Sequence, residues 1–119
     1  MLKRLIASTA VIATTALGTG LAVATPAAAD PCPAGALCAY LYTDYRGDPG
    51  TVYGNNSNLL QYNKFNNAVS VSNSGTQCNV RIYSGLSRTG SSVNIPRGYG
   101  IGNLSGTAFY KNIASNHWC

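Results

Sequence analysis

Short runs of apolar and β-branched residues alternate with polar turn residues along most of this chain. The runs that have the composition of strands cover residues 37–43, 51–54, 68–72, 79–83, 92–95 and 107–110. Within residues 79–83, Val80 and Ile82 alternate with Arg81, which is the pattern of a strand with one buried face. No stretch keeps a helical period. The pattern therefore predicts an all-β domain.

One part of the chain recurs in degenerate form, because residues 39–47 return 43 positions later as residues 82–90. In both copies an aromatic residue precedes a glycine by seven positions, as Tyr40 precedes Gly47 and Tyr83 precedes Gly90. This spacing suits a folded-over hairpin in which the glycine adopts a positive φ and the ring packs beneath the fold.

A second echo follows at an offset of 45, where residues 66–70 return as residues 111–115. We therefore expect two copies of one unit, at about residues 37–75 and 78–119. Eight short strands in two copies of four would form a two-sheet Greek-key sandwich.

Residues 1–29 have the features of a secretory signal. Lys3 and Arg4 are followed by a long uncharged stretch that ends with three alanines before Asp30, which predicts cleavage after Ala29. The alternative is an uncleaved membrane anchor, but threonine, serine and glycine make the stretch poorly hydrophobic, and no second apolar run follows. We expect a secreted, extracellular domain at residues 30–119 with no attachment to a membrane.

Charge adds little to this interpretation. After residue 29 the chain keeps six basic and three acidic side chains, a net charge of +3. The basic residues are spread along the sequence and form no cluster of the kind that binds nucleic acid. We expect a monomer that binds neither nucleic acid nor membranes.

Four cysteines lie in the predicted mature part, and an even count in a small exported chain indicates disulfide bonds. Three pairings exist in principle. We favour Cys32 with Cys38, which brackets a short turn, and Cys78 with Cys119, which would tie residue 119 to the start of the second copy. The disulfide between Cys78 and Cys119 closes the larger ring and should stabilise the fold by about 4 kcal/mol. The disulfide between Cys32 and Cys38 closes the smaller ring and should contribute about 2.5 kcal/mol. A zinc site is not expected, because the spacing Cys-x-x-Cys is absent.

The sequence argues against an enzyme. It holds one histidine, His117, and three side-chain carboxylates, and it lacks the hydrolase, phosphate-loop and zinc-protease motifs. Asp44 and Asp48 flank a turn that they would stabilise through local hydrogen bonds. His117 suits a packing or surface role.

Two stretches are candidates for binding. Residues 72–79 join the two copies, and a rigid, disulfide-anchored segment of this kind can enter a protease cleft at low ordering cost and keep its ends after cleavage. The alternative is an ordinary linker between repeats. Residues 66–70 offer amide and hydroxyl oxygens of the kind Ca²⁺ accepts. Asparagine-rich turns also form for conformational reasons, and Lys111 places a cation at the corresponding position of the second copy.

The combined pattern resembles a known family. It consists of Cys-Pro-Ala-Gly-Ala-Leu-Cys-Ala-Tyr at 32–40, the aromatic residue seven positions before glycine, Asn-Asn-x-x-Ser at 66–70, and Gly-Thr-Gln-Cys-Asn-Val-Arg-Ile-Tyr at 75–83. This pattern is similar to that of the secreted bacterial metalloproteinase inhibitors typified by the Streptomyces metalloproteinase inhibitor, and it spans residues 32–119. The resemblance implies a βγ-crystallin fold and an extracellular partner, a thermolysin-like zinc endopeptidase.

The resemblance also implies site residues. The inhibitory loop would consist of Gln77, Cys78, Asn79 and Val80, with Cys78 at its centre. Thermolysin-like enzymes favour a large apolar residue after the scissile bond, whereas Asn79 is small and polar. Either Val80 fills the apolar pocket in a shifted register or inhibition is weak.

From the crystallin side, the resemblance implies calcium ligands at Asn66, Asn67 and Ser70 in the first copy and at Asn112 and Ser115 in the second. Val71 and Asn116 occupy the position at which that calcium-binding pattern ends with a serine, so strong calcium binding is not expected. We expect no other cofactor. Two alternatives to an inhibitor stay open: a calcium-binding or structural βγ-crystallin module, and a killer-toxin-like antimicrobial protein of the same fold.

Overall fold

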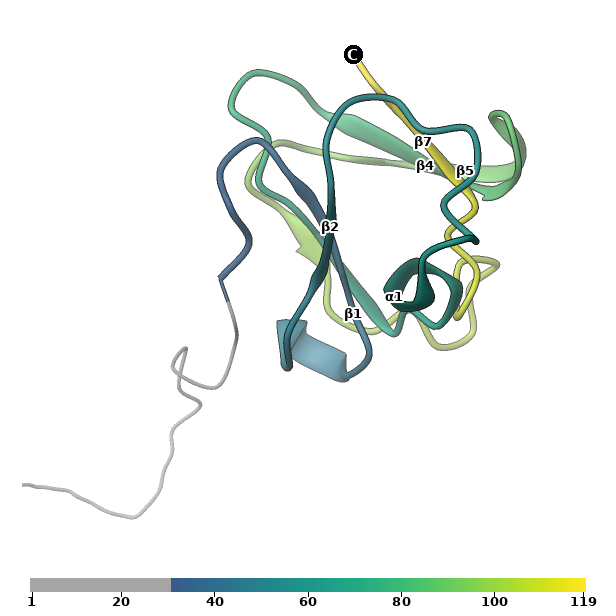
Figure 1. Cartoon of the computed structure of the whole chain (residues 1–119), viewed down its shortest axis with the longest axis horizontal. Coiled ribbons are helices and arrows are strands. Elements are labelled where there is room, and N and C mark those ends of the chain that lie inside the picture. Colours follow the sequence, from purple (N-terminus) through teal and green to yellow (C-terminus); the bar gives the residue numbers. More distant parts are fainter. Residues whose placement is uncertain (1–30) are drawn as a thin grey trace, which may run out of the picture.

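The protein is a sandwich of two antiparallel β-sheets, as a computed structural model that describes residues 31–119 shows (Figure 1). The first sheet has the order β2-β1-β3-β6 and is built from Gly50–Val52, Leu37–Tyr40, Ser70–Asn73 and Gly100–Ile101. The second has the order β5-β4-β7 and is built from Thr89–Ile95, Val80–Gly85 and Ser115–Trp118. The signal predicted for residues 1–29 lies outside the described residues.

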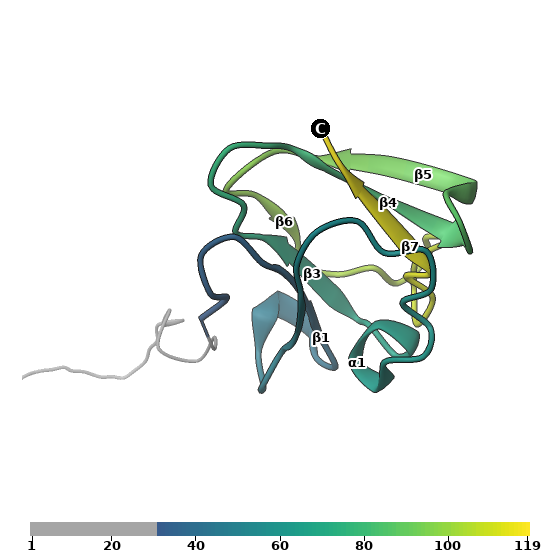
Figure 2. The same cartoon turned by 45° about the horizontal axis from the view of Figure 1, so that its top comes forward.

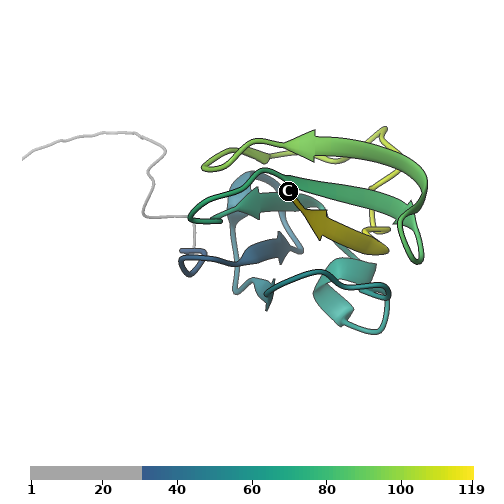
Figure 3. The ribbon, with the colours of Figure 1, turned by 90° about the horizontal axis from the view of Figure 1, so that it is seen from above.

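Each copy of the repeat contributes to both sheets. β6 lies between β5 and β7 in the sequence, yet it pairs with β3 of the first copy through Val71↔Ile101. In return, Asn56 of the first copy forms a bridge with Asn116 of β7, and their N–H groups donate to each other's carbonyl at 3.3 and 3.1 Å. The two-sheet Greek-key sandwich agrees with the prediction, whereas the crossover that interlocks the two copies was not predicted (Figures 2 and 3).

The strand prediction was right for five of its six runs, with shifted ends, and wrong for the sixth. Residues 107–110 form turns, in which the Thr107 hydroxyl donates to the Leu104 carbonyl at 2.7 Å and accepts the Phe109 N–H at 3.2 Å. These local bonds replace a strand ladder. Among the described residues there are seven strands rather than eight. One short α-helix, α1 at Asn63–Asn66, and a 3-10 turn at Thr43–Tyr45 were not expected.

The core fills the space between the two sheets. It combines side chains from β1, β2 and β3 with side chains from β4 and β5, and it is closed by residues of the connecting segments. Its buried members are Leu37, Ala39, Val52, Leu59, Phe65, Ala68, Val71, Val80, Ile82, Ile95, Leu104, Phe109 and Ile113. The inward side of β4 consists of Val80 and Ile82, both fully buried, as the alternation with exposed Arg81 predicted.

Both predicted hairpins fold over at equivalent positions. Gly47 and Gly90 have φ values of 88° and 78°, which confirms the positive φ expected of them. Each glycine is preceded by two further residues in the left-handed region, Asp44 and Tyr45 at 58° and 60° in the first copy and Ser87 and Arg88 at 53° and 64° in the second. These non-glycine residues carry backbone strain that the surrounding structure must offset.

A buried serine holds each folded hairpin in place. The Ser70 hydroxyl donates to the Tyr42 carbonyl at 2.7 Å and accepts the Tyr45 N–H at 3.1 Å. At the equivalent site the Ser115 hydroxyl donates to the Gly85 carbonyl at 2.7 Å and accepts the Arg88 N–H at 2.9 Å. Both serines are fully buried. Each therefore fixes a strained turn to the last strand of its own copy.

The aromatic side chain of the first hairpin packs as predicted. Tyr40 is 1% exposed and meets the ring of Tyr45 edge to face, with centroids 5.9 Å apart. Burial raises the pKa of the Tyr45 phenol, and the neighbouring Asp44 carboxylate raises the pKa further. The phenol therefore stays neutral well into the alkaline range.

Both disulfides have the expected pairing. Cys32 is bonded to Cys38 and Cys78 to Cys119, with Cα atoms 5.9 and 5.4 Å apart. In the part of the chain that the structure describes, no helix has the length and apolar character needed to cross a membrane.

The two serine contacts generate the first testable prediction. Ser70→Ala and Ser115→Ala should each lower the free energy of unfolding by about 1–3 kcal/mol, because each removes a fully buried hydroxyl and leaves a partly buried N–H and carbonyl without their partner. For a domain of this size that corresponds to a fall in Tm of about 4–8 °C per kcal/mol. Thermal unfolding followed by circular dichroism measures the effect, with exposed Ser105→Ala as the control. Equal Tm values for all three variants would contradict the role assigned to the buried hydroxyls.

Candidate functional site

The connection between β3 and β4 carries the candidate site. It leaves the first sheet at Asn73 and enters the second at Val80, so it bridges the two sheets at one end of the sandwich (Figure 1). We refer to residues 75–79 as the 75–79 loop. Thr76, Gln77 and Asn79 are exposed and Cys78 is half-buried. The loop therefore presents a short polar surface on both sides of the Cys78–Asn79 peptide bond.

The buried amide of Asn73 holds the loop from beneath. Its oxygen accepts the Gly75 N–H at 2.7 Å, and its nitrogen donates to the carbonyls of Cys78 at 3.3 Å and Ile95 at 2.9 Å. Asn73 is 1% exposed. One side chain thus links the beginning of the loop, its central cysteine and the end of β5.

The first disulfide turn supports the same end of the connection. The Ser74 N–H donates to the Ala36 carbonyl at 2.9 Å, and the Gly35 N–H donates to the Ser74 carbonyl at 2.7 Å. The Ser74 hydroxyl donates to the Cys32 carbonyl at 3.1 Å. The turn that Cys32 and Cys38 close is therefore bound to the residue that precedes the loop.

The second disulfide and Arg97 fix the other end. Cys78 is bonded to Cys119, whose N–H donates to the Asn79 carbonyl at 3.3 Å. The Arg97 guanidinium donates to the Thr76 carbonyl at 2.9 Å, and the Arg97 N–H donates to the Asn79 side-chain oxygen at 3.1 Å. Residues on both sides of the Cys78–Asn79 bond are thus tied to neighbouring segments.

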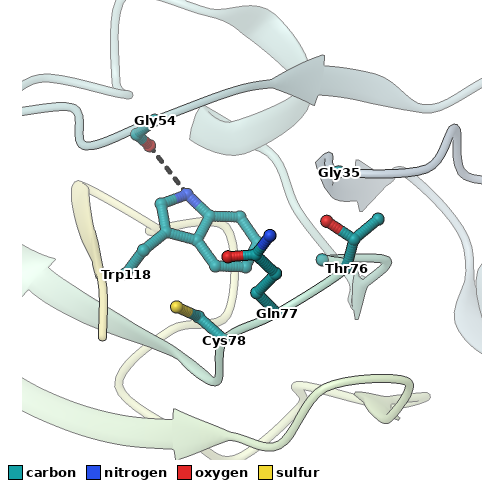
Figure 4. A pocket seen from close by; sticks show the side chains of 7 residues that line it. Gly35, Gly54, Thr76, Gln77, Cys78 and Trp118 are labelled. Carbon is teal, nitrogen blue, oxygen red and sulfur yellow. Dashed lines mark hydrogen bonds between the residues drawn. The ribbon is translucent and has the colours of Figure 1, made fainter.

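Trp118 forms the wall behind the loop, as Figure 4 shows. Its indole N–H donates to the Gly54 carbonyl at 2.9 Å, and its backbone N–H donates to the Asn55 side chain at 2.8 Å. The ring packs so closely on Gly75 that a Cβ there would lie 2.5 Å from it. A pocket of about 220 Å³ lies between the indole, the loop and Gly35.

Val80 requires a correction. The sequence interpretation placed it in the inhibitory loop, where it would fill a protease pocket in a shifted register. In the structure it begins β4, is fully buried and belongs to the core between the sheets. Its side chain cannot contact a partner in this fold. Gln77, Cys78 and Asn79 are the three predicted loop residues that the structure leaves accessible.

Several of the calcium ligands predicted for the two copies form hydrogen bonds within the chain. Ser70 and Ser115 bind the hairpins, as described above. The Asn67 amide donates to the Asn63 carbonyl at 3.0 Å, and the Asn112 amide donates to the Ala108 carbonyl at 3.2 Å. These equivalent bonds close turns within the chain, and Asn66 is exposed.

Metal ligands of other kinds do not gather either. Lys111 has a φ of 54° and lies 5.4 Å from the centre of the Tyr110 ring. Within residues 31–119, no three His, Cys, Asp or Glu side chains come together to bind a metal ion. Calcium binding remains a prediction from the resemblance.

Sequence reasoning missed the residues that support the loop. Asn73, Arg97 and Trp118 had no assigned role, because they are far apart in the sequence and meet only after the two copies interlock. One signal was available for Trp118: at the offset of 45 it corresponds to Asn73, so both residues end the last strand of their copy.

Solved structures with this architecture are βγ-crystallin domains. A structure from work on the evolution of the eye-lens βγ-crystallin domain fold matches with a TM-score of 0.65 and 18% identity over 76% of this chain and 91% of that chain. IPSE/alpha-1 from Schistosoma mansoni eggs matches with a TM-score of 0.55 and 22% identity, over 71% and 84%. A βγ-crystallin from Ciona intestinalis matches with a TM-score of 0.54 and 14% identity, over 71% of this chain and 100% of that chain. At sequence identities this low, the similarity to these structures shows the fold alone.

The sequence itself identifies the family. The family model of peptidase inhibitor family I36 matches residues 25–95, more than half of the chain. The chain therefore belongs to peptidase inhibitor family I36, and it is an inhibitor with a protease partner rather than an enzyme. No curated protein matches it closely enough to add a nearer relative.

The burial of Val80 generates the second prediction. Val80→Asp should unfold the domain at 25 °C, because it places an unpaired carboxylate in the core at a cost above about 3 kcal/mol. Circular dichroism and one-dimensional NMR measure the loss. Asn79→Asp, one position earlier and exposed, should keep the native spectrum. A folded Val80→Asp protein with weakened inhibition would restore Val80 to the contact surface.

Proposed function

We propose that this protein is a secreted, monomeric inhibitor of thermolysin-like zinc endopeptidases that offers the Cys78–Asn79 bond to the catalytic centre. The observation that carries the proposal is the support of the 75–79 loop on both sides of that bond. Asn73 and the disulfide hold Cys78, while Arg97 and Cys119 hold Asn79.

Such support favours inhibition over digestion for two physical reasons. The loop loses little conformational entropy on entering a cleft, because hydrogen bonds already restrict it before binding. If the bond is cut, the new end at Cys78 stays bonded to Cys119, and the new end at Asn79 stays at the start of β4. The two ends remain in place for religation, and the product leaves slowly.

The family resemblance supports the zinc class of the target, and the accessible residues bear on the strength of inhibition. Asn79 follows the bond, and its side chain is exposed, so it would face the pocket where thermolysin-like enzymes prefer a large apolar group. We infer modest inhibition by the natural sequence. Two disulfides fit the extracellular location in which such proteases act.

A titration tests the proposal. The purified, oxidised protein should reduce thermolysin activity at micromolar concentration and leave subtilisin, a serine protease, unaffected. Asn79→Leu removes the bond that the Asn79 side chain accepts from the Arg97 N–H, at a cost of about 0.5–1.5 kcal/mol. It should still lower the inhibition constant for thermolysin, by up to about tenfold, since a hydrophobic pocket gains about 1–3 kcal/mol from such a group. Gln77→Leu, which adds the same group before the bond, is the control.

Full thermolysin activity with the wild-type protein and with Asn79→Leu would refute the assigned target. Inhibition of subtilisin alone would replace the zinc class with the serine class. A rise in Tm with millimolar calcium, without inhibition of either enzyme, would favour the structural crystallin module instead.

The role of Asn73 gives a further prediction. Asn73→Ala leaves the Gly75 N–H and the Cys78 carbonyl without their partner, so the loop should become mobile and thermolysin should cut it at least about tenfold faster than wild type. Mass spectrometry of timed digests measures cleavage between Cys78 and Asn79 after reduction of the disulfide.

The matched control is Asn112→Ala. Its amide also makes two bonds to carbonyls, those of Ser84 and Ala108, but they lie outside the loop. Both variants should lose about 1–3 kcal/mol of stability. Equal cleavage rates for the two would show that global unfolding, and not loop support, controls digestion.

A further inference from the structure

The 75–79 loop is too small to form a stable interface alone. It exposes Thr76, Gln77 and Asn79, whereas a stable protein complex buries about 800 Å² on each partner, contributed by about 20–30 residues. An endopeptidase that takes the loop into its cleft must therefore also rest on surface beside the loop. Our inference identifies that second contact surface, and it rests on the proposed function.

The outer side of the β5-β4-β7 sheet adjoins the loop directly. A hollow of about 180 Å³ begins at the loop and extends over the sheet, and it is lined by Asn79, Arg81, Tyr83, Asn94, His117, Trp118 and Cys119. Arg81 is the register partner of Asn94 on β5 and of His117 on β7. These three side chains therefore form one row across the sheet, on the side away from the core.

The charged side chain on this side of the sheet is Arg81, and none of the side chains that line the hollow is acidic. We call Arg81, Tyr83, Asn94 and His117 the basic face. Arg81 is exposed, and its guanidinium donates to the neutral Ser92 hydroxyl at 3.1 Å, so its charge is not neutralised by that contact.

Residues 49–119 contain no Asp or Glu. In the described part of the chain, the acidic side chains are Asp44 and Asp48, next to the first hairpin. That hairpin lies on the other side of the molecule from β5 and β7 (Figures 1 and 2).

We propose that the basic face docks on an acidic surface at the rim of the inhibited endopeptidase's cleft. The basic face is continuous with the loop, since Asn79 and Cys119 belong both to the loop region and to the hollow. A protease that binds the loop would therefore bring the rim of its cleft against this face. Charge selects the partner's chemistry, because Arg81 would meet a carboxylate at a short distance. Attraction of this kind speeds association more than it slows dissociation.

The test compares two charge reversals of equal size. Arg81→Glu lies in the basic face, and Lys111→Glu lies in an exposed turn that hydrogen-bonds to Ala68, away from the loop. Association rate and inhibition constant are measured from progress curves with thermolysin at about 20 mM and about 500 mM NaCl, where the Debye lengths differ about fivefold. Circular dichroism verifies that both variants fold, and Arg81→Ser replaces Arg81→Glu if the latter does not.

Arg81→Glu should slow association about tenfold at low salt and less than about twofold at high salt. Arg81→Ser should slow it about threefold, and Lys111→Glu should stay within about twofold of wild type. Equal effects of the two reversals would overturn the proposal, because net charge would then explain them. Unchanged rates for Arg81→Glu with wild-type inhibition intact would overturn it too, while leaving the proposed function in place. Absence of inhibition by the wild-type protein is the separate failure of the proposed function, and this inference fails with it.

Discussion

The exchange of one strand between the two copies is the constraint on which the rest of the structure depends. β6 of the second copy completes the first sheet beside β3, and the Asn56 bridge of the first copy extends the second sheet beside β7. Neither sheet is complete within its own copy, so the two copies must fold together. This arrangement forces the chain to cross from one sheet to the other between β3 and β4, and that crossing is the 75–79 loop.

Because the copies interlock, segments that are remote in sequence converge behind the loop. Arg97 arrives from the turn between β5 and β6, Trp118 from β7, and Ser74 meets the turn closed by the first disulfide. A linker between two independent repeats would have none of these contacts. The rigidity that we assign to the loop is therefore a consequence of the topology, to which the Cys78–Cys119 bond adds.

The sequence predicted the sandwich and the disulfides because each leaves a local pattern. Aromatic and glycine spacing marks the hairpins, and cysteine positions bracket turns. It failed at residues 107–110, where Thr107 uses its hydroxyl in a local turn, and it missed β6 because two residues carry no alternation. Val80 was misplaced because the loop was taken from the family resemblance, whereas the alternation of Val80 and Ile82 with Arg81 already indicated a buried position in a strand.

The equivalent positions of the two copies show how one fold acquired an asymmetric site. Ser70 and Ser115 have kept the same contacts, since both must hold a strained hairpin. Asn73 and Trp118 occupy the same place at the ends of β3 and β7, yet they act differently. The amide of Asn73 binds the loop by hydrogen bonds from below, while the indole of Trp118 packs against it from the side. The side chains that hold the hairpins are thus alike in both copies, whereas the side chains at the strand ends differ, and the candidate site lies where both strand ends meet one loop.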